Sequence, residues 1–281
     1  MDAPDFLVIG HVAKDVGDDG WRLGGTVAYA SIQAERLGLR AAVVTSASTD
    51  VDLEQLLPNV RVHCVPSREA TTFENRYRNG RRVQRVLAQA SAIEPEHVPE
   101  GWRGARIVLL GPLLGEVPIE MGQPFGRSLL GFCAQGWLRE VRSDGLVSRR
   151  AWRAGASLRG GSIVVASEED IEDDRGELDV WTREVPLVAV TGGEGGARLY
   201  ADGRWRRIAA FPHEEVDPTG AGDVFAAAFL ISYSEADDIP VAARFAAAAA
   251  ALSVGAEGTA GVATREEIDQ MLAEHTEVTL R

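Results

Sequence analysis

The chain has 281 residues, 45% of them hydrophobic, so it can form one large α/β domain or two smaller domains with a substantial core. It carries 29 basic and 42 acidic residues, and the resulting net charge of −13 argues against a surface that binds nucleic acid or anionic membranes. The longest apolar stretch, residues 246–254, is mostly alanine and much shorter than the roughly 20 residues that a membrane span needs.

The first predicted elements alternate between buried strands and a helix. Gly24-Gly25 opens a helix whose apolar residues keep helical spacing, and Gly38 ends it. Short buried strands are expected on either side of this helix, at residues 6–9, 40–45 and 60–65.

A polar segment with a different pattern follows at residues 71–87. It consists of two strands around Asn79-Gly80, a strong signal for a two-residue hairpin turn. The hairpin is too polar for the core. Together with residues 12–23 we expect it to form a small sheet that covers a cleft, and its exposed strands favour a homodimer through this lid.

The remaining sequence returns to an α/β pattern. Two helices are expected near the end, from Asp223 onwards and over 241–254, the second rich in alanine and able to pack closely. Buried strands are expected at residues 107–110, 129–132, 163–165 and 187–190. This pattern predicts a central, mostly parallel sheet with helices on both faces, in one domain over residues 1–281, because we find no linker and no repeat.

Two glycine-rich turns should lie together at the carboxyl ends of the strands, where ligands collect in such sheets. The first, Thr191-Gly192-Gly193-Glu194-Gly195-Gly196, has four glycines that let the backbone approach a ligand closely. The second, Asp217-Pro218-Thr219-Gly220-Ala221-Gly222-Asp223, leads at once into an apolar helix. A helix start with bare backbone N–H groups is suited to an anion.

The aspartate that closes the second turn favours phosphoryl transfer. Asp223 is placed to take a proton from an attacking hydroxyl, while the N–H groups of Gly220, Ala221 and Gly222 hold the charge on the phosphoryl group. A simple helix cap by Thr219 or Asp217 is the alternative, but it does not account for the two glycines and the second aspartate.

Several common enzyme classes are excluded by absent motifs. Lys14 is the only lysine, which rules out a P-loop and a protein-kinase site, so backbone donors become the principal phosphate ligands. The dinucleotide, zinc-protease and serine-hydrolase fingerprints are also missing. Cys64 and Cys133 lack metal-ligand spacing, and no leader opens the chain, so we expect a cytoplasmic protein.

With these motifs, the chain resembles the ribokinase-like, or PfkB, family of carbohydrate kinases over essentially its whole length. The resemblance rests on four features in the family's order: Gly10 followed by Asp15, Gly24-Gly25 at a helix start, the Thr191 to Gly196 turn, and the Asp217 to Asp223 turn. The last is the most specific. The resemblance implies a ribokinase-like fold with a small β lid and an ATP-dependent kinase that phosphorylates a hydroxyl of a sugar or cyclic polyol.

The resemblance also implies roles for individual residues. Asp223 is the base and Gly220 to Gly222 form the anion hole. The acceptor is bound by Asp15, Gly24 and Gly25 beneath the lid, with Asn75, Gln135 and Arg139 as further ligands. The nucleotide lies along Thr191, Gly193 and Gly196, with Thr219, and against residues 250–258, which include Ser253.

Metal ions enter through the same resemblance. Where the family has Asn-x-x-Glu, this chain has Ser167-Glu168-Glu169-Asp170, so Glu169 and Asp170 are expected to contact Mg²⁺ through water. Helix capping by Ser167 explains the same residues nearly as well. A monovalent cation such as K⁺ near Asp217 and Thr219 is a further implication.

The acceptor is left open between several classes. The Ser-Glu-Glu element and the segment 135–139 look similar to the inositol-kinase-like branch, and Tyr29 stands where sugar binders often have Asn. A nucleoside or sugar-phosphate kinase on the same fold is one alternative. The other is a ligand-binding regulator without catalytic activity on a degenerate kinase scaffold.

Overall fold

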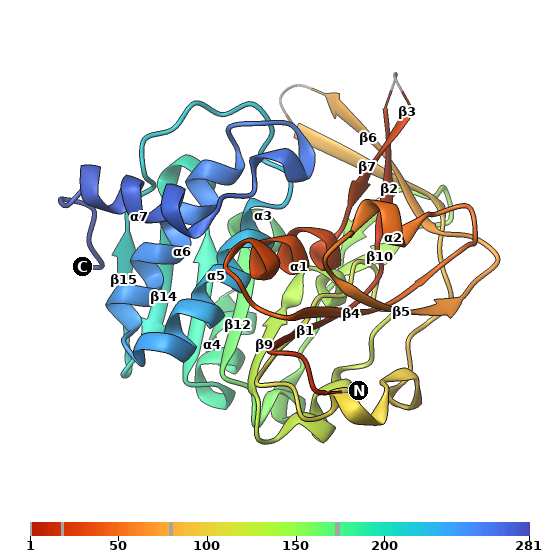
Figure 1. Cartoon of the computed structure of the whole chain (residues 1–281), viewed down its shortest axis with the longest axis horizontal. Coiled ribbons are helices and arrows are strands. Elements are labelled where there is room, and N and C mark those ends of the chain that lie inside the picture. The colour runs from red at the N-terminus through yellow and green to blue at the C-terminus, as the bar shows by residue number, and fades with distance from the viewer. Residues whose placement is uncertain (1, 18–19, 79–80, 172–174) are drawn as a thin grey trace.

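A nine-stranded sheet forms the body of the protein in the computed structural model, which describes residues 2–17, 20–78, 81–171 and 175–281 (Figure 1). Its strands are β1 (Phe6–Ile9), β4 (Ala41–Ala47), β5 (Arg61–Pro66), β8 (Ile107–Leu110), β9 (Leu129–Cys133), β12 (Ile163–Ser167), β13 (Leu187–Thr191), β14 (Ala197–Ala201) and β15 (Arg204–Ile208). Their order is β15-β14-β13-β12-β9-β8-β1-β4-β5. All neighbours from β5 to β13 are parallel, and β14 and β15 add an antiparallel edge. The mostly parallel sheet is therefore confirmed.

Helices cover both faces of this sheet, but unequally. The helices on one face are α1 (Thr26–Arg36), α5 (Ala221–Ala236), α6 (Ile239–Ser253) and α7 (Arg265–Glu274), of which α7 was not predicted. The other face packs against α4 (Arg175–Glu184) and several 3-10 turns. Along β1 the side chains alternate between the two cores, Phe6 and Val8 toward one and Leu7 and Ile9 toward the other.

Two connections between strands of the sheet contain no long α-helix. Only a single turn, α2 (Leu53–Leu56), lies between β4 and β5, and the connection from β8 to β9 contains a 3-10 helix at Ile119–Phe125. Pro112, Pro118 and Pro124 interrupt the second connection, and each removes a backbone donor that an α-helix would need. The apolar residues of this segment still cover the sheet.

The predicted lid is confirmed as a separate four-stranded sheet, drawn at the upper right of Figure 1. Its strands are β2 (Ala13–Gly17), β3 (Gly20–Gly24), β6 (Thr71–Arg78) and β7 (Arg81–Ala88), in the order β3-β2-β6-β7. β2 and β6 pair in parallel, and β6 and β7 are antiparallel with Asn75 opposite Gln84. The hairpin turn predicted at residues 79–80 lies outside the described residues.

A short hairpin that was not predicted lies against the outer edge of the lid. It consists of β10 (Arg139–Val141) and β11 (Val147–Arg149), and the loop between them meets β7. Arg85 and Leu146 form a β-bridge, and Val86 donates its N–H to the carbonyl of Gly145 at 2.9 Å. This edge is partly covered, so the homodimer through the lid stays a prediction.

No helix in the described ranges is long and apolar enough to span a membrane.

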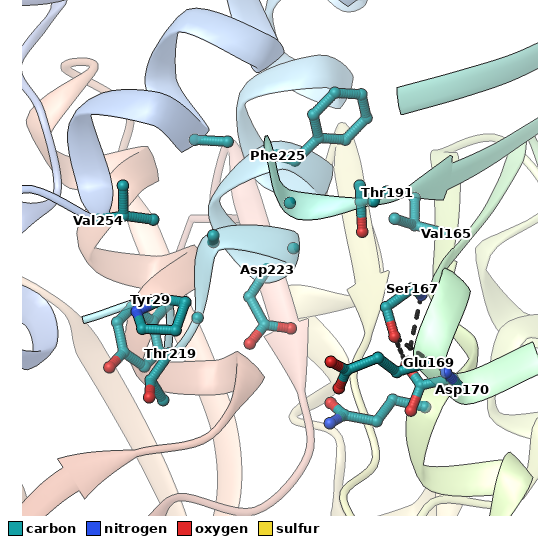
Figure 2. Close-up of a pocket in the computed structure, with 18 of the residues that line it drawn as sticks. Tyr29, Val165, Ser167, Glu169, Asp170, Thr191, Thr219, Asp223, Phe225 and Val254 are labelled. Carbon is teal, nitrogen blue, oxygen red and sulfur yellow. Dashed lines mark hydrogen bonds between the residues drawn. The ribbon is translucent and has the colours of Figure 1, made fainter. Parts of the chain in front are cut away.

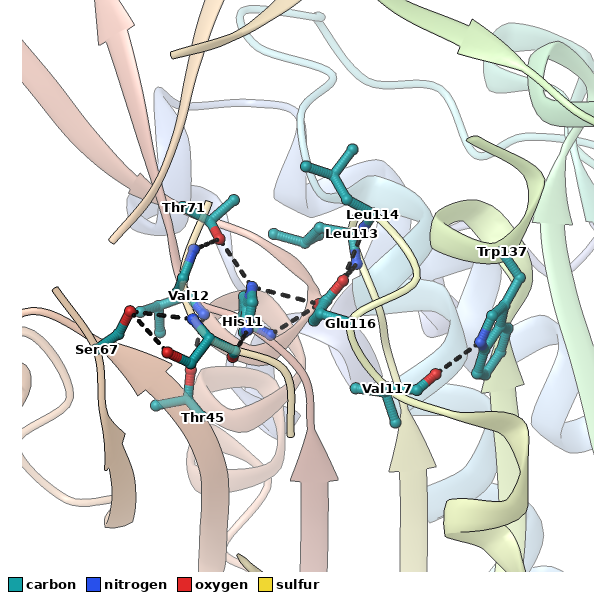
Figure 3. A network of polar contacts seen from close by, with 12 residues as sticks. His11, Val12, Thr45, Ser67, Thr71, Leu113, Leu114, Glu116, Val117 and Trp137 are labelled. Carbon is teal, nitrogen blue, oxygen red and sulfur yellow. Dashed lines mark hydrogen bonds and ion pairs between the residues drawn. The ribbon is translucent and has the colours of Figure 1, made fainter. Parts of the chain in front are cut away.

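A buried polar network joins the lid to the body (Figure 3). The carboxylate of Glu116 accepts hydrogen bonds from the N–H groups of His11 at 3.1 Å, Leu113 at 2.9 Å and Leu114 at 2.8 Å. The imidazole of His11 donates from Nε2 to the carbonyl of Ser91 at 2.8 Å and accepts at Nδ1 from the Thr71 hydroxyl at 2.7 Å. The network therefore holds together the starts of β2 and β6 and the loop after β8.

Removal of the Glu116 carboxylate should destabilise the protein strongly. The Glu116→Ala variant leaves several buried N–H groups without an acceptor, and we expect a loss of about 3–5 kcal/mol in the free energy of unfolding. Glu116→Gln should cost less, because one acceptor oxygen remains. Urea denaturation measures both values, with the exposed Glu120→Ala as control. Equal midpoints for Glu116→Ala and the control would contradict the role of this network.

Candidate active site

A cavity of about 730 Å³ lies between the inner face of the lid and the carboxyl ends of the central strands. Most of the predicted site residues line it. They are Asp15, Gly25, Gln135 and Arg139 at the lid end, Glu169 and Asp170 after β12, Thr191, Gly193 and Gly196 after β13, and Thr219, Gly220, Ala221, Gly222 and Asp223 at the start of α5. The two glycine-rich turns thus lie at one site, as expected for the carboxyl ends of parallel strands.

The turn before α5 is shaped by close packing against α1. Gly220 has φ +81°, and a Cβ atom there would lie 2.3 Å from the ring of Tyr29. Both the backbone angle and the lack of space therefore require glycine. Of the three N–H groups expected to hold an anion, that of Ala221 points at the carbonyl of Pro218 over a long 3.4 Å. A hydrogen bond of this length is weak, so the N–H of Ala221 can bind a ligand instead at little cost in free energy.

Asp223 lies in the first turn of α5 and faces the cavity. Figure 2 shows its carboxylate directed into the space between Tyr29 and Thr219 on one side and Ser167, Glu169 and Asp170 on the other. Cys133, at the end of β9, also lines the cavity, and burial together with the charges of Asp223 and Asp170 raises the pKa of its thiol well above the usual value. Cys133 therefore stays a neutral thiol beside the two carboxylates.

The turn after β13 is a tight backbone loop. Gly192 donates its N–H to the carbonyl of Gly196 at 2.7 Å, and Gly196 has φ +80° with no room for a Cβ against the carbonyl of Ile208. Beside it, α5 and the C-terminal part of α6 provide an apolar wall made of Phe225, Ala247, Ala250, Ala251 and Val254. Backbone donors next to an apolar wall suit a planar base with an attached phosphate chain.

Ser253 does not belong to this wall. Its side chain is buried, and its hydroxyl donates to the carbonyl of Ala250 one turn earlier at 2.8 Å. The lining of the cavity comes from the neighbouring positions of α6, because successive helix residues point about 100° apart. Within the predicted stretch 250–258, the cavity is lined by Ala250, Ala251 and Val254, and a nucleotide contact at Ser253 stays a prediction.

The acidic segment after β12 forms a helix cap. The Ser167 hydroxyl donates to the Asp170 carboxylate at 2.7 Å, and the N–H of Asp170 donates back to the Ser167 hydroxyl at 3.1 Å. Asp170 also accepts from Arg139 at 3.2 Å, so both of its oxygens already have partners. Glu168 and Glu169 line the cavity beside it. No cluster of three metal-ligating side chains occurs among the described residues, and the Mg²⁺ contacts stay a prediction.

Asp217 supports the turn from behind and does not line the cavity. Its carboxylate accepts from the N–H groups of Thr219 at 3.0 Å and Gly258 at 2.9 Å. Burial alone would raise the pKa of Asp217, but these hydrogen bonds and the charge of Arg22 hold it below the usual value. The carboxylate is therefore anionic, and a cation beside it stays a prediction.

At the lid end, two predicted residues, Gly24 and Asn75, do not line the cavity but lie next to the carboxylate of Asp15. Asn75 donates its amide to the Asp15 carboxylate at 2.9 Å, and Gly24 leaves room for the same carboxylate, since a Cβ there would lie 2.1 Å from Asp15 Oδ2. Gln84, Phe73 and Leu113 line the cavity and were not predicted. A two-residue turn at 79–80 places residue 84 opposite Asn75, which is the pairing that the structure shows. Gln84 could therefore have been predicted as a site residue from the position of the turn.

The charge on the lining residues is strongly negative. The carboxylates in the lining are those of Asp15, Glu168, Glu169, Asp170, Glu194, Glu215 and Asp223. Arg139 is the single arginine among the described residues that line the cavity, and its guanidinium is paired with Asp170. The cavity therefore favours phosphates that arrive with their own counterions.

Part of the chain matches a known family of enzymes. The sequence pattern of pfkB family carbohydrate kinases matches residues 164–265. Ribokinase of Bacillus subtilis is 46% identical over 87 residues, which are 30% of this chain and 29% of that protein. Cytidine kinase of Thermococcus kodakarensis is 28% identical over 260 residues, covering 82% of this chain and 88% of the relative. Inositol 3-kinase of Oryza sativa subsp. japonica is 48% identical over 71 residues, 24% of this chain and 18% of that protein.

Solved structures show the same fold over nearly the whole chain. A pyrophosphate-dependent kinase of the ribokinase family, complexed with a pyrophosphate analogue and myo-inositol, has a TM-score of 0.79 at 24% identity and covers 94% of this chain and 99% of its own. Arabidopsis thaliana ribokinase, complexed with ribose and ATP, has a TM-score of 0.72 at 20% identity and covers 96% and 99%. The chain therefore has the ribokinase-like fold, and its residues 164–265 match the pfkB family of carbohydrate kinases.

Proposed function

We propose that this protein transfers a phosphoryl group from ATP to a hydroxyl of a small sugar or cyclic polyol. The observation that carries the proposal is the arrangement at the start of α5, where Asp223 faces the cavity beside the glycine turn. A base and an anion-binding backbone at one point are what phosphoryl transfer to a hydroxyl requires. The lid covers the same cavity, which keeps water from competing as the acceptor.

The proposed step assigns one task to each group. The Asp223 carboxylate takes the proton of the acceptor hydroxyl as its oxygen bonds to the transferred phosphorus, and the bond from phosphorus to the leaving phosphate breaks. The N–H groups of the turn and the positive end of α5 stabilise the charge on the phosphoryl oxygens during transfer. Asp15 and its neighbours on the lid hold the other hydroxyls of the acceptor.

Divalent metal fits the donor side of the site. The excess of carboxylates repels a bare polyphosphate, so the donor would bind as its Mg²⁺ complex, and Glu168, Glu169 and Asp170 would contact that ion through water. When bound, Mg²⁺ neutralises charge on the donor phosphates. The residues present are oxygen ligands of the type that Mg²⁺ prefers.

The comparisons suggest one alternative to ATP as the donor and one alternative to a sugar or polyol as the acceptor. The apolar wall of α5 and α6 supports a nucleotide donor, while the likeness to a pyrophosphate-dependent kinase makes pyrophosphate the donor to compare. A nucleoside acceptor is favoured by the long match to cytidine kinase and by the apolar Phe73 and Leu113 at the lid end.

A donor and acceptor panel tests the proposal. We expect product formation, detected by mass spectrometry, from at least one of myo-inositol, ribose, fructose and cytidine with ATP and Mg²⁺, and less product with pyrophosphate. Thermal shifts report binding separately from catalysis. Ligand binding with either donor and no product from any acceptor would overturn the kinase and favour a regulator without catalytic activity.

A further inference from the structure

A row of hydrogen bonds runs along the lid end of the cavity, from Arg139 to Asp15. Arg139 Nη1 donates to Gln84 Oε1 at 3.3 Å, and Gln84 Nε2 donates to Asn75 Oδ1 at 3.0 Å. Asn75 Nδ2 in turn donates to Asp15 Oδ1 at 2.9 Å. The row begins on β10, passes through β7 and β6, and ends on β2.

All of these hydrogen bonds run in one direction, from a cation to a carboxylate. An amide has a carbonyl at one side and an NH₂ at the other, so each amide in the row must adopt one orientation. Gln84 determines this order, because its carbonyl must face Arg139 and its NH₂ must face Asn75. The Asn75 amide is then turned with its NH₂ toward Asp15, and the carboxylate of Asp15 is held in one rotamer.

The charge of Arg139 is balanced on its other side. Arg139 Nη2 lies 3.2 Å from Asp170 Oδ1, and the two side chains are only 19% and 10% exposed. Asp170 is itself held by Ser167 at the start of α3 (Glu168–Ile171). A partly buried pair of this kind presents little net charge, and Asp15, the other charged residue at the lid end among the described lining residues, is a carboxylate.

We propose that Gln84 is a positioning residue that orders the acceptor site for an uncharged, polyhydroxylated acceptor, and that the pairing of Asp170 with Arg139 excludes acceptors that already carry phosphate. This inference rests on the proposed function. An acceptor hydroxyl donates to the fixed carboxylate of Asp15, whereas a phosphate at the same place meets that carboxylate and finds the guanidinium already paired. The kinase therefore acts before any other phosphorylation of its acceptor.

Substitutions of Gln84 test the ordering role. Gln84→Met keeps the length of the side chain and removes both hydrogen bonds, and Gln84→Glu keeps the contact with Arg139 but cannot donate to Asn75. We expect both variants to weaken acceptor binding by about tenfold or more, with an unchanged KM for the donor. The matched control is Leu87→Met, which places methionine on the exposed outer face of the same strand.

The Gln84→Glu variant separates ordering from simple support of the fold. A merely structural contact with Arg139 would be kept or strengthened by the added charge, so acceptor affinity would then match the wild type. Calorimetry of myo-inositol binding without donor, with thermal unfolding measured in parallel, gives the readout. Wild-type affinity in a folded Gln84→Glu or Gln84→Met variant would overturn the proposal.

Substitution of Asp170 tests the selection by charge. In Asp170→Asn the charge of Arg139 is no longer balanced, and we expect the ratio of affinities for ribose 5-phosphate and ribose to rise by about tenfold relative to the wild type. Both affinities are measured without Mg²⁺ and donor, so a metal role of Asp170 does not enter. An unchanged ratio would overturn the exclusion, as would a wild type that binds ribose 5-phosphate more tightly than ribose.

The experiments distinguish a failure of this inference from a failure of the proposed function. If the protein binds polyols but transfers no phosphate, the affinity changes in the Gln84 and Asp170 variants still appear and only the kinase is lost. If phosphotransfer occurs in the panel and these variants bind as the wild type does, the kinase stands and the inference is wrong.

Discussion

Replacement of Asp223 by asparagine should lower kcat by about 10²- to 10⁴-fold, which is the usual contribution of a positioned general base. Asparagine has nearly the same shape and leaves the start of α5 intact, but it cannot take the proton of the acceptor hydroxyl. The KM values of donor and acceptor should change little, because neither ligand depends on this carboxylate for most of its contacts. Initial rates with saturating acceptor and ATP measure the effect.

A second aspartate provides the control for this experiment. Asp269→Asn removes the same charge from the exposed face of α7, far along the chain from the glycine turn, and should keep wild-type activity. Circular dichroism and thermal unfolding confirm that both variants are folded. A folded Asp223→Asn variant with more than about a tenth of the wild-type kcat would show that Asp223 is not the base.

Replacement of Gly220 by alanine should damage both stability and activity. A left-handed backbone angle costs a residue with a Cβ roughly 1–2 kcal/mol, and overpacking against a buried ring adds about 1–3 kcal/mol. Here φ is +81° and the new Cβ would lie 2.3 Å from the Tyr29 ring, so we expect a loss of about 2–5 kcal/mol in the free energy of unfolding. The turn must shift, and kcat should fall with it.

Two further variants separate the cost of the backbone angle from the cost of the overlap with the Tyr29 ring. Gly203→Ala has a similar angle, φ +76°, in the turn between β14 and β15, with no atom near the added Cβ, so it measures the cost of the angle alone. Combining Gly220→Ala with Tyr29→Ala removes the obstructing ring, and the double variant should lose less stability than the sum of the single losses. Strict additivity, or a Gly220→Ala variant as stable as Gly203→Ala, would contradict the packing argument.

Local sequence patterns were sufficient for most of the elements. The apolar runs of the sheet strands, the glycines around α1 and the Asn79-Gly80 signal of the lid each depend on neighbours within a few residues. The prolines between β8 and β9 are also visible in the sequence, and they explain why this connection has a 3-10 helix instead of an α-helix. The hairpin of β10 and β11 was missed because its short strands are only partly buried and lack a clear apolar alternation.

The resemblance to pfkB carbohydrate kinases, the parallel sheet and the turn that ends in Asp223 could all be predicted from the sequence, because each depends on a contiguous motif or a local periodicity. Three features become visible only in the folded protein: Ser253 does not line the cavity, the Tyr29 ring fills the space beside Gly220, and Gln84 connects Arg139 to Asn75. The contacts of Tyr29 with Gly220 and of Arg139 with Gln84 join segments far apart in the chain. Their geometry depends on packing between elements, which no short stretch of sequence specifies.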